Sequence, residues 1–98
     1  MTAPDTPLVI SLGDPCGVGP EIVAKAWHAL RDQPRLAFAV LGDADLLSRY
    51  APVARCAASA DAASAFADAL PVLDRPLTAA VAPGRPDAAH APHIIGWI

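Results

Sequence analysis

The sequence has 98 residues, of which 54% are hydrophobic, and its formal net charge is −3. A chain of this size and composition fits one small globular domain, or a portion of a larger one, with a modest core. The mildly acidic balance and the scattered basic residues argue against nucleic acid or an anionic membrane surface as the main partner. With two cysteines, no visible signal peptide and no apolar run of bilayer length, the chain is expected in a reducing cytoplasm.

The first predicted element is a strand over residues 8–12, with the sequence LVISL. A short, apolar, β-branched run between a proline and a glycine is typical of a strand that is buried on both faces. A loop over residues 13–19 follows, and a helix is predicted from Pro20 to about Asp32. Proline fits the first helical position, where its missing N–H costs nothing, and Glu21 complements the positive end of the helix dipole.

A second buried strand is predicted over residues 36–41, LAFAVL. Asp43 is a good N-cap for a helix that follows it, whose apolar face is formed by Leu46, Leu47 and Tyr50. The first half therefore alternates strand, helix, strand and helix. That order predicts the α/β class, with a mostly parallel sheet covered by helices.

The second half carries weaker signals. Short strands are predicted over residues 53–56 and 71–74, and the alanine-rich stretch 57–70 is either helix or loop. Residues 76–86 look irregular, and a last helix opens between residues 87 and 92.

The last nine residues, HAPHIIGWI, form an apolar, helix-like run without a polar turn or a capping residue after it. In that reading Ile94, Ile95, Trp97 and Ile98 have no obvious surface to cover. The sequence is therefore interpreted as truncated, with residues 1–98 forming the N-terminal portion of a single larger α/β domain.

The stretch SLGDPCGVGPEI places a glycine-rich loop between a strand and the start of a helix. Such a loop can bind an anion, because free backbone N–H groups and the positive helix end meet there. The glycines stand at positions 13, 17 and 19, so the dinucleotide-binding spacing G-x-G-x-x-G is absent. The phosphate-binding P-loop is excluded as well, because Pro20 and Glu21 occupy the places of its lysine and hydroxyl residue. By spacing alone, a tight strand-to-helix turn explains the loop equally well.

Residues 7–27, PLVISLGDPCGVGPEIVAKAW, resemble the N-terminal segment of the 4-hydroxythreonine-4-phosphate dehydrogenase family, which has the form GDPxGIGPEI before a helix. The likeness continues, in family order, through VLGDADLL, LPVLD and PGRPDAAHA. The chain departs from the pattern at Cys16, where a small residue is usual, and at Val18, where isoleucine is common. The isocitrate and isopropylmalate dehydrogenases, whose fold this family resembles, carry a related GDGIGPE turn.

The resemblance implies a three-layer α/β/α fold and a homodimer with its active site in a cleft near the subunit interface. It also implies NAD-dependent (or NADP-dependent) oxidation of 4-hydroxythreonine 4-phosphate, a small phosphorylated substrate, in vitamin B6 synthesis. Decarboxylation of the resulting β-keto acid would then give an amino-ketone phosphate. A divalent metal such as Zn, Mg or Co would polarise the reacting oxygen.

In this family the metal-binding histidines and the basic residues for the substrate phosphate lie well beyond the glycine loop. No catalytic or metal-binding residue is therefore carried over to this chain. Only the loop is carried over, and the resemblance implies that Asp14, Gly17, Gly19 and Glu21 line or shape the cofactor side of the cleft.

Several other residues could have a catalytic or metal-binding role, but a structural role is the preferred interpretation for each. His90 and His93 have the spacing of two metal ligands, but no third ligand is apparent, which favours surface histidines. Cys16 lies near a helix start, where a thiol can become reactive, but it is read as an inert packing residue. Asp43 and Asp45 are explained as a helix cap and a first-turn charge. His28, one further histidine, is read as a partly exposed helix residue.

Three alternatives to the main interpretation stay open, and one of them is an inert truncated product. Another is a paralogue that acts on threonate 4-phosphate or erythronate 4-phosphate, because substrate discrimination would lie outside these residues. The third is a small binding module that uses the glycine loop for a phosphorylated ligand.

Overall fold

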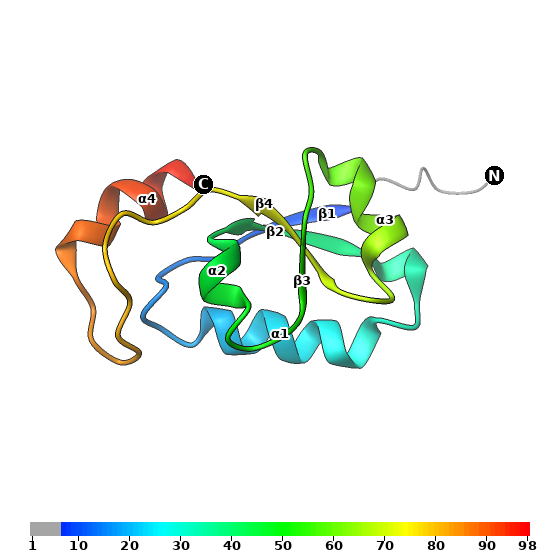
Figure 1. The fold of residues 1–98 in the computed structure, drawn as a ribbon, viewed down its shortest axis with the longest axis horizontal. Coiled ribbons are helices and arrows are strands. Elements are labelled where there is room, and N and C mark those ends of the chain that lie inside the picture. The colour runs from blue at the N-terminus through cyan, green and yellow to red at the C-terminus, as the bar shows by residue number, and fades with distance from the viewer. Residues whose placement is uncertain (1–6) are drawn as a thin grey trace.

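The predicted strands assemble into one sheet in which every pair of neighbours is parallel (Figure 1). The computed structural model describes residues 7–98. The strands are β1 (Leu8–Ser11), β2 (Phe38–Gly42), β3 (Val53–Arg55) and β4 (Leu70–Asp74), and their order across the sheet is β1-β2-β4-β3. The predicted α/β class with a parallel sheet is confirmed.

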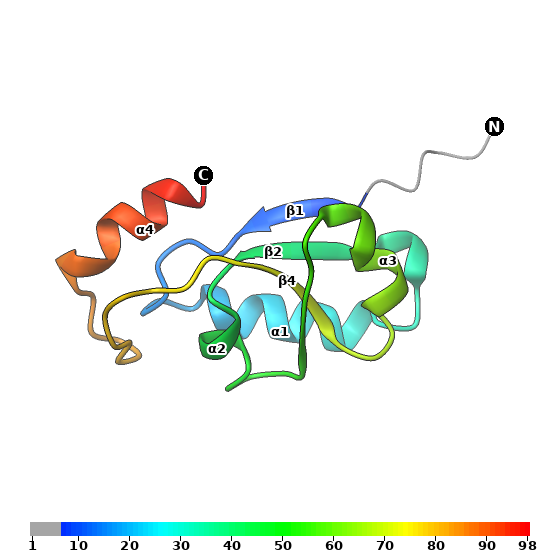
Figure 2. The ribbon, with the colours of Figure 1, turned by 45° about the horizontal axis from the view of Figure 1, so that its top comes forward.

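Helices connect these strands in the order that the sequence predicts. They are α1 (Gly19–Leu30), α2 (Ala44–Leu47), α3 (Ala62–Ala65) and α4 (Ala91–Gly96), with 3-10 turns η1 (Pro34–Leu36), η2 (Ser59–Asp61) and η3 (Ala88–His90). Figure 2 shows α1 and α2 on the same side of the sheet. The alanine-rich stretch before β4 is therefore neither one helix nor one loop, since it contains η2 and the single turn α3.

The core lies between α1, α2 and one face of the sheet. Because side chains alternate along a strand, Phe38 and Val40 of β2 point to the same face as Leu70 and Val72 of β4. The indole of Trp27 on α1 packs against this cluster, and its Nε1–H donates a hydrogen bond of 2.7 Å to the carbonyl oxygen of Phe66.

The prediction that the first strand is buried on both faces is wrong for the part of the chain that the structure describes. β1 lies at the edge of the sheet and pairs only with β2 there, so Leu8 is 73% exposed and Val9 is 46% exposed. An apolar composition can show that a strand is suited to burial, but it does not show how many neighbours the strand has.

Two predicted boundaries move by two residues. β2 begins at Phe38 because Pro34 opens the η1 turn, in which the N–H of Ala37 donates to the Pro34 carbonyl. Helix α1 ends at Leu30, whose carbonyl accepts from the N–H of Gln33 in a closing turn.

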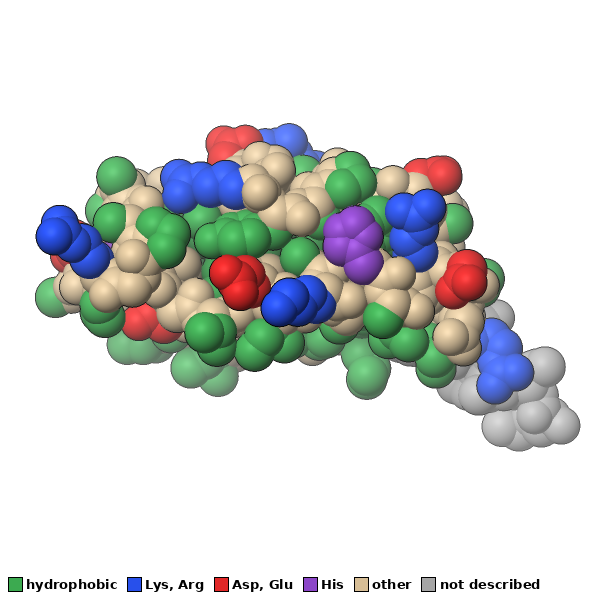
Figure 3. All heavy atoms as spheres, turned by 90° about the horizontal axis from the view of Figure 1, so that it is seen from below, with side chains coloured by type: hydrophobic (Ala, Val, Ile, Leu, Met, Phe, Trp, Pro, Cys, Tyr) green, Lys and Arg blue, Asp and Glu red, His purple; other side chains and the backbone are tan. Residues whose placement is uncertain are grey.

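Helix α1 turns a polar side to solvent. Its exposed side chains include Lys25 and His28, which confirms the interpretation of His28 as a helix surface residue. Seen from below, this side of the molecule mixes charged, histidine and hydrophobic side chains (Figure 3). None of the helices within residues 7–98 has the length and hydropathy that crossing a membrane would need.

Residues 75–98, which we call the carboxyl-terminal arm, extend past the carboxyl ends of the strands and return through α4 (Figures 1 and 2). The expectation that the apolar residues of the last helix have no surface to cover is wrong in part. Trp97 is only 2% exposed and Ile94 packs against the core cluster, whereas Ile95 and Ile98 are exposed. The arm therefore packs onto the core of the domain through Trp97 and Ile94.

Candidate functional site

The carboxyl ends of the strands bring the chemically informative loops to one end of the molecule. The glycine loop follows β1, Asp43 follows β2, and Asp74 ends β4. The carboxyl-terminal arm lies beyond this same end of the sheet (Figure 2). In open parallel α/β sheets, ligands bind outside the carboxyl ends of the strands. The predicted loop therefore lies at the end of the sheet at which folds of this kind bind ligands, while its contact with a ligand remains a prediction.

The first part of the glycine loop is a tight turn built on Asp14. The N–H of Gly17 donates to the Asp14 carbonyl at 3.0 Å, and the N–H of Cys16 donates to Asp14 Oδ1 at 2.9 Å. Aspartate, proline and glycine occupy the first, second and fourth positions, which are the positions each favours in a type I turn. The Asp14 carboxylate thus shapes the loop while remaining exposed to solvent.

The three glycines of the loop are required to different degrees. Gly13 has a φ of +76°, a backbone conformation that favours glycine. A Cβ on Gly19 would lie 2.4 Å from the carbonyl oxygen of Leu12, so only glycine lets the start of α1 approach the end of β1 this closely. A Cβ on Gly17 would lie 3.4 Å from the Asp14 carbonyl oxygen, which is ordinary contact. Gly17 therefore has the weakest structural reason to be glycine.

Asp43 connects three segments at this end of the sheet. Its Oδ1 accepts from the N–H of Leu46 at 2.9 Å, which confirms it as the N-cap of α2. Its Oδ2 accepts from the N–H of Leu77 at 2.7 Å, which ties the start of the arm to the end of β2. The capping role was predictable from local sequence, but the bond to Leu77 spans 34 residues and was not.

Asp74 and Arg55 form an exposed ion pair beside Asp43. Asp74 Oδ2 accepts from Arg55 Nε at 3.2 Å, while Asp74 Oδ1 accepts from the N–H of Ala44 at 2.9 Å. Arg55 Nη2 also donates to Asp45 at 2.6 Å, so Asp45 is more than a first-turn charge. Hydrogen bonds to Asp74 and then to Asp45 raise the pKa of Arg55. Sequence reasoning missed this pair because Arg55 and Asp74 meet only through the pairing of β3 with β4.

His90 is not the surface histidine that was expected. It is 1% exposed, and its Nδ1 lies 3.5 Å from the Sγ of Cys16, which is also buried. His90 Nε2 lies 3.4 Å from the Ala79 carbonyl oxygen, an arrangement in which Nε2–H donates and Nδ1 accepts from the thiol. The N–H of Gly84 donates to the Cys16 carbonyl at 2.8 Å, so two bonds fasten the arm to the glycine loop at Cys16.

The two histidines of the H-x-x-H pair do not converge on one point. His93 Nε2 lies 3.0 Å from Thr78 Oγ1, whereas His90 faces Cys16. Within residues 7–98, no group of three or more His, Cys, Asp or Glu side chains comes together as a metal site. The predicted metal ligands outside this chain remain a prediction, as do the cofactor contacts of Asp14, Gly17, Gly19 and Glu21.

The reactivity of Cys56, the second cysteine, tests how its surroundings change the pKa of its thiol. Burial foremost, and then the nearby charge of Asp61, raise the pKa of the Cys56 thiol. Since a thiolate is the reactive form, alkylation of Cys56 by iodoacetamide should follow a pH profile whose midpoint lies above that of the urea-unfolded chain. Peptide mass spectrometry separates Cys56 from Cys16, which is buried and should react more slowly. A folded-state midpoint at or below the unfolded one would contradict this.

Comparison with known proteins identifies relatives of nearly the whole chain. No protein-family model matches the chain. The 4-hydroxythreonine-4-phosphate dehydrogenase of Caulobacter vibrioides is 53% identical over 95 residues, which are 94% of this chain and 28% of that protein. Proteins of the same name are 44% identical over 95 residues in Erythrobacter litoralis and 41% identical over 102 residues in Xanthobacter autotrophicus. These matches cover 89% and 97% of this chain, but only 28% and 29% of the relatives.

The resemblance inferred from GDPCGVGPEI is thereby confirmed along nearly the whole chain. The chain spans a little over a quarter of the length of the curated relatives that it matches. It is a relative of the 4-hydroxythreonine-4-phosphate dehydrogenase family.

Proposed function

We propose that this chain forms part of an NAD-dependent dehydrogenase that acts on 4-hydroxythreonine 4-phosphate. The single observation that carries the proposal is the 53% identity to a protein of that name over 94% of the chain. Because the matches span a little over a quarter of each relative, we further propose that residues 1–98 are the N-terminal portion of a single larger α/β domain. The complete protein would work as a homodimer.

The proposed reaction is a hydride transfer followed by loss of CO₂. The secondary carbinol carbon of the substrate would give a hydride to the nicotinamide and its hydroxyl would give a proton to a base. The resulting β-keto acid would lose CO₂, and the enolate left behind would take up a proton to give an amino-ketone phosphate. A divalent metal such as Zn, Mg or Co, bound by residues outside this chain, would polarise the alcohol and ketone oxygens. The substrate pocket would also lie outside these residues.

The part of this chain in the reaction is to shape the cofactor side of the cleft. The Asp14 turn and the tight contact between Gly19 and Leu12 fix the loop against the start of α1. Gly17 is exposed and is the loop glycine with the least structural need to be glycine, which supports a role in close approach to a ligand. Glu21 is exposed in the first turn of α1, beside the same loop.

A chimeric enzyme tests this assignment. In the Caulobacter vibrioides relative, the matching segment would be replaced by this chain, and NADH formation from 4-hydroxythreonine 4-phosphate would be followed by absorbance. We expect the chimera to be active and the isolated 98-residue chain to show no turnover. Gly17→Val in the chimera should raise the KM for NAD by about tenfold, because the added side chain fills the approach to the loop.

The control is Ala60→Val, which also introduces a valine, at an exposed position in η2. This variant should leave the KM for NAD unchanged. An unchanged KM for NAD in Gly17→Val would contradict the loop's role, whereas turnover by the isolated chain would contradict the proposal that working parts lie outside it.

A further inference from the structure

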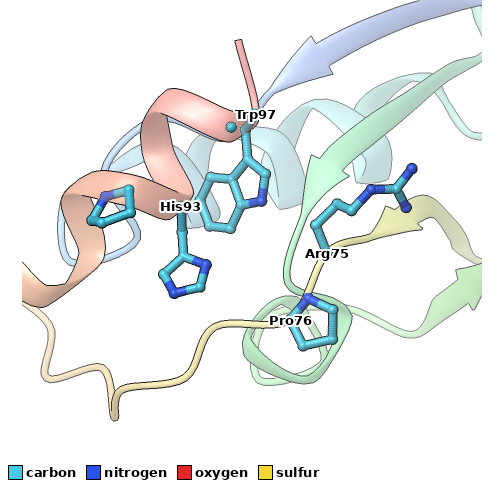
Figure 4. A pocket seen from close by; sticks show the side chains of 6 residues that line it. Arg75, Pro76, His93 and Trp97 are labelled. Carbon is cyan, nitrogen blue, oxygen red and sulfur yellow. The ribbon is translucent and has the colours of Figure 1, made fainter.

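The carboxyl-terminal arm lines a pocket of about 280 Å³, to which no residue of the glycine loop contributes. It lies between the end of β4 and helix α4 and is lined by Arg75, Pro76, Pro92, His93, Gly96 and Trp97 (Figure 4). The volume lies just below the usual range for small-molecule pockets, about 300 to 1,000 Å³. The site is open on one side, so it can admit a ligand without a change in the fold.

Arg75 supplies a positive charge that the described residues leave without a carboxylate partner. Its neighbour Asp74 is engaged by Arg55 and by the N–H of Ala44. The guanidinium of Arg75 is exposed, and Nη1 donates only to the Asp74 carbonyl at 2.9 Å. A guanidinium carries five N–H donors, so most of them remain available for the oxygens of an anion.

The walls of the pocket add apolar surface and further donors. Figure 4 shows the indole of Trp97 and the imidazole of His93 on the α4 side of the pocket and Pro76 on the opposite side, with the Arg75 side chain extending away from Trp97. An indole nitrogen can only donate a hydrogen bond. The proline rings offer flat apolar contact. The lining therefore combines a cation with apolar side chains and contains no carboxylate.

We propose that this pocket binds a small phosphate monoester that carries a flat apolar group. The phosphate would bind to Arg75 at the open side, and the apolar group would lie between Trp97 and the prolines. Arginine suits this task because its planar fork matches the oxygens of a phosphate. The proposal depends only on the arm as the structure describes it and stands independently of the dehydrogenase reaction.

The test uses the 98-residue chain labelled with ¹⁵N, in which the two indole N–H signals belong to Trp27 and Trp97. The fully buried Trp27, bonded to the Phe66 carbonyl, serves as the internal reference for the folded state. Phenyl phosphate should shift the Trp97 signal in a saturable way. Inorganic phosphate should bind more weakly, and phenol, which lacks the anion, should produce no saturable shift.

Arg75→Gln should weaken the binding of phenyl phosphate by about tenfold, and Arg75→Lys should restore part of it. The matched control is Arg35→Gln, which makes the same change in net charge in η1, before the start of β2. It should change the affinity by less than about twofold. Three results would each overturn the proposal. The two glutamine variants could lose equal affinity, the Trp97 signal could stay unmoved, or both indole signals could merge at the position of the unfolded chain.

Discussion

Replacement of Gly19 by alanine is expected to lower the free energy of unfolding by about 3 kcal/mol. The added Cβ would lie 2.4 Å from the carbonyl oxygen of Leu12, a distance that real Cβ atoms do not reach. The obstructing atom belongs to the backbone, so relief requires moving the start of α1 away from the end of β1. Urea denaturation followed by circular dichroism measures the change.

Gly17→Ala is the control from the same loop. Its Cβ would lie 3.4 Å from the Asp14 carbonyl oxygen, so the backbone can remain in place and stability should change by less than about 0.5 kcal/mol. Equal losses at Gly19 and Gly17 would show that the whole loop, and not the strand-to-helix contact, is the sensitive feature. In that case the reading of Gly19 as a packing glycine would be wrong.

Gly17 and Gly19 belong to one motif but have different structural roles. Both belong to the pattern that resembles the dehydrogenase family, yet the structure gives only Gly19 a compelling packing reason. The motif alone could not separate the two roles, because a one-dimensional spacing does not say which backbone atom faces which residue. The glycine loop can therefore be both a tight turn and a ligand-binding loop.

Local sequence was sufficient wherever the determining contacts are local. The four strands, the helix that begins near Pro20 and the cap at Asp43 were all predicted from residues within a few positions of each other. Such features depend on periodicity, proline geometry and capping, which act over one turn of chain.

The features that sequence reasoning missed depend on contacts between distant segments. His90 was expected at the surface, but residue 90 meets Cys16 across 74 positions, and both are buried by the fold of the arm. Trp97 was expected to lack a covering surface, but it is buried as part of the core cluster. No local sequence pattern near His90 or Trp97 predicts either contact. The candidate pocket at Arg75 was missed for the same reason.

A few hydrogen bonds along the carboxyl-terminal arm hold it against the rest of the fold. Asp43 binds the N–H of Leu77 where the arm leaves the sheet, and Cys16 binds the far part of the arm through Gly84 and His90. The pocket between β4 and α4 exists only while the arm keeps this course. Its first fastening point is therefore the place where a single change should have the widest effect.

Asp43→Ala is expected to destabilise the fold by about 2 to 3 kcal/mol. The loss combines the cap of α2, typically about 1 kcal/mol, with the cost of leaving the partly buried N–H of Leu77 without an acceptor, about 1 to 2 kcal/mol. Asp43→Asn keeps one oxygen for one of these bonds and should lose roughly half as much. Urea denaturation gives the free energies, and the indole signal of Trp97 reports on the arm.

Asp45→Ala is the control, since Asp45 is an exposed acid two residues away whose partner is the exposed Arg55. Surface ion pairs contribute little, so this variant should unfold close to the original chain with an unchanged Trp97 signal. If Asp43→Ala lowered stability while the Trp97 signal stayed in place, the bond to Leu77 would not hold the arm. The destabilisation would then belong to the helix cap alone, and the pocket would owe its shape to Cys16 and His90.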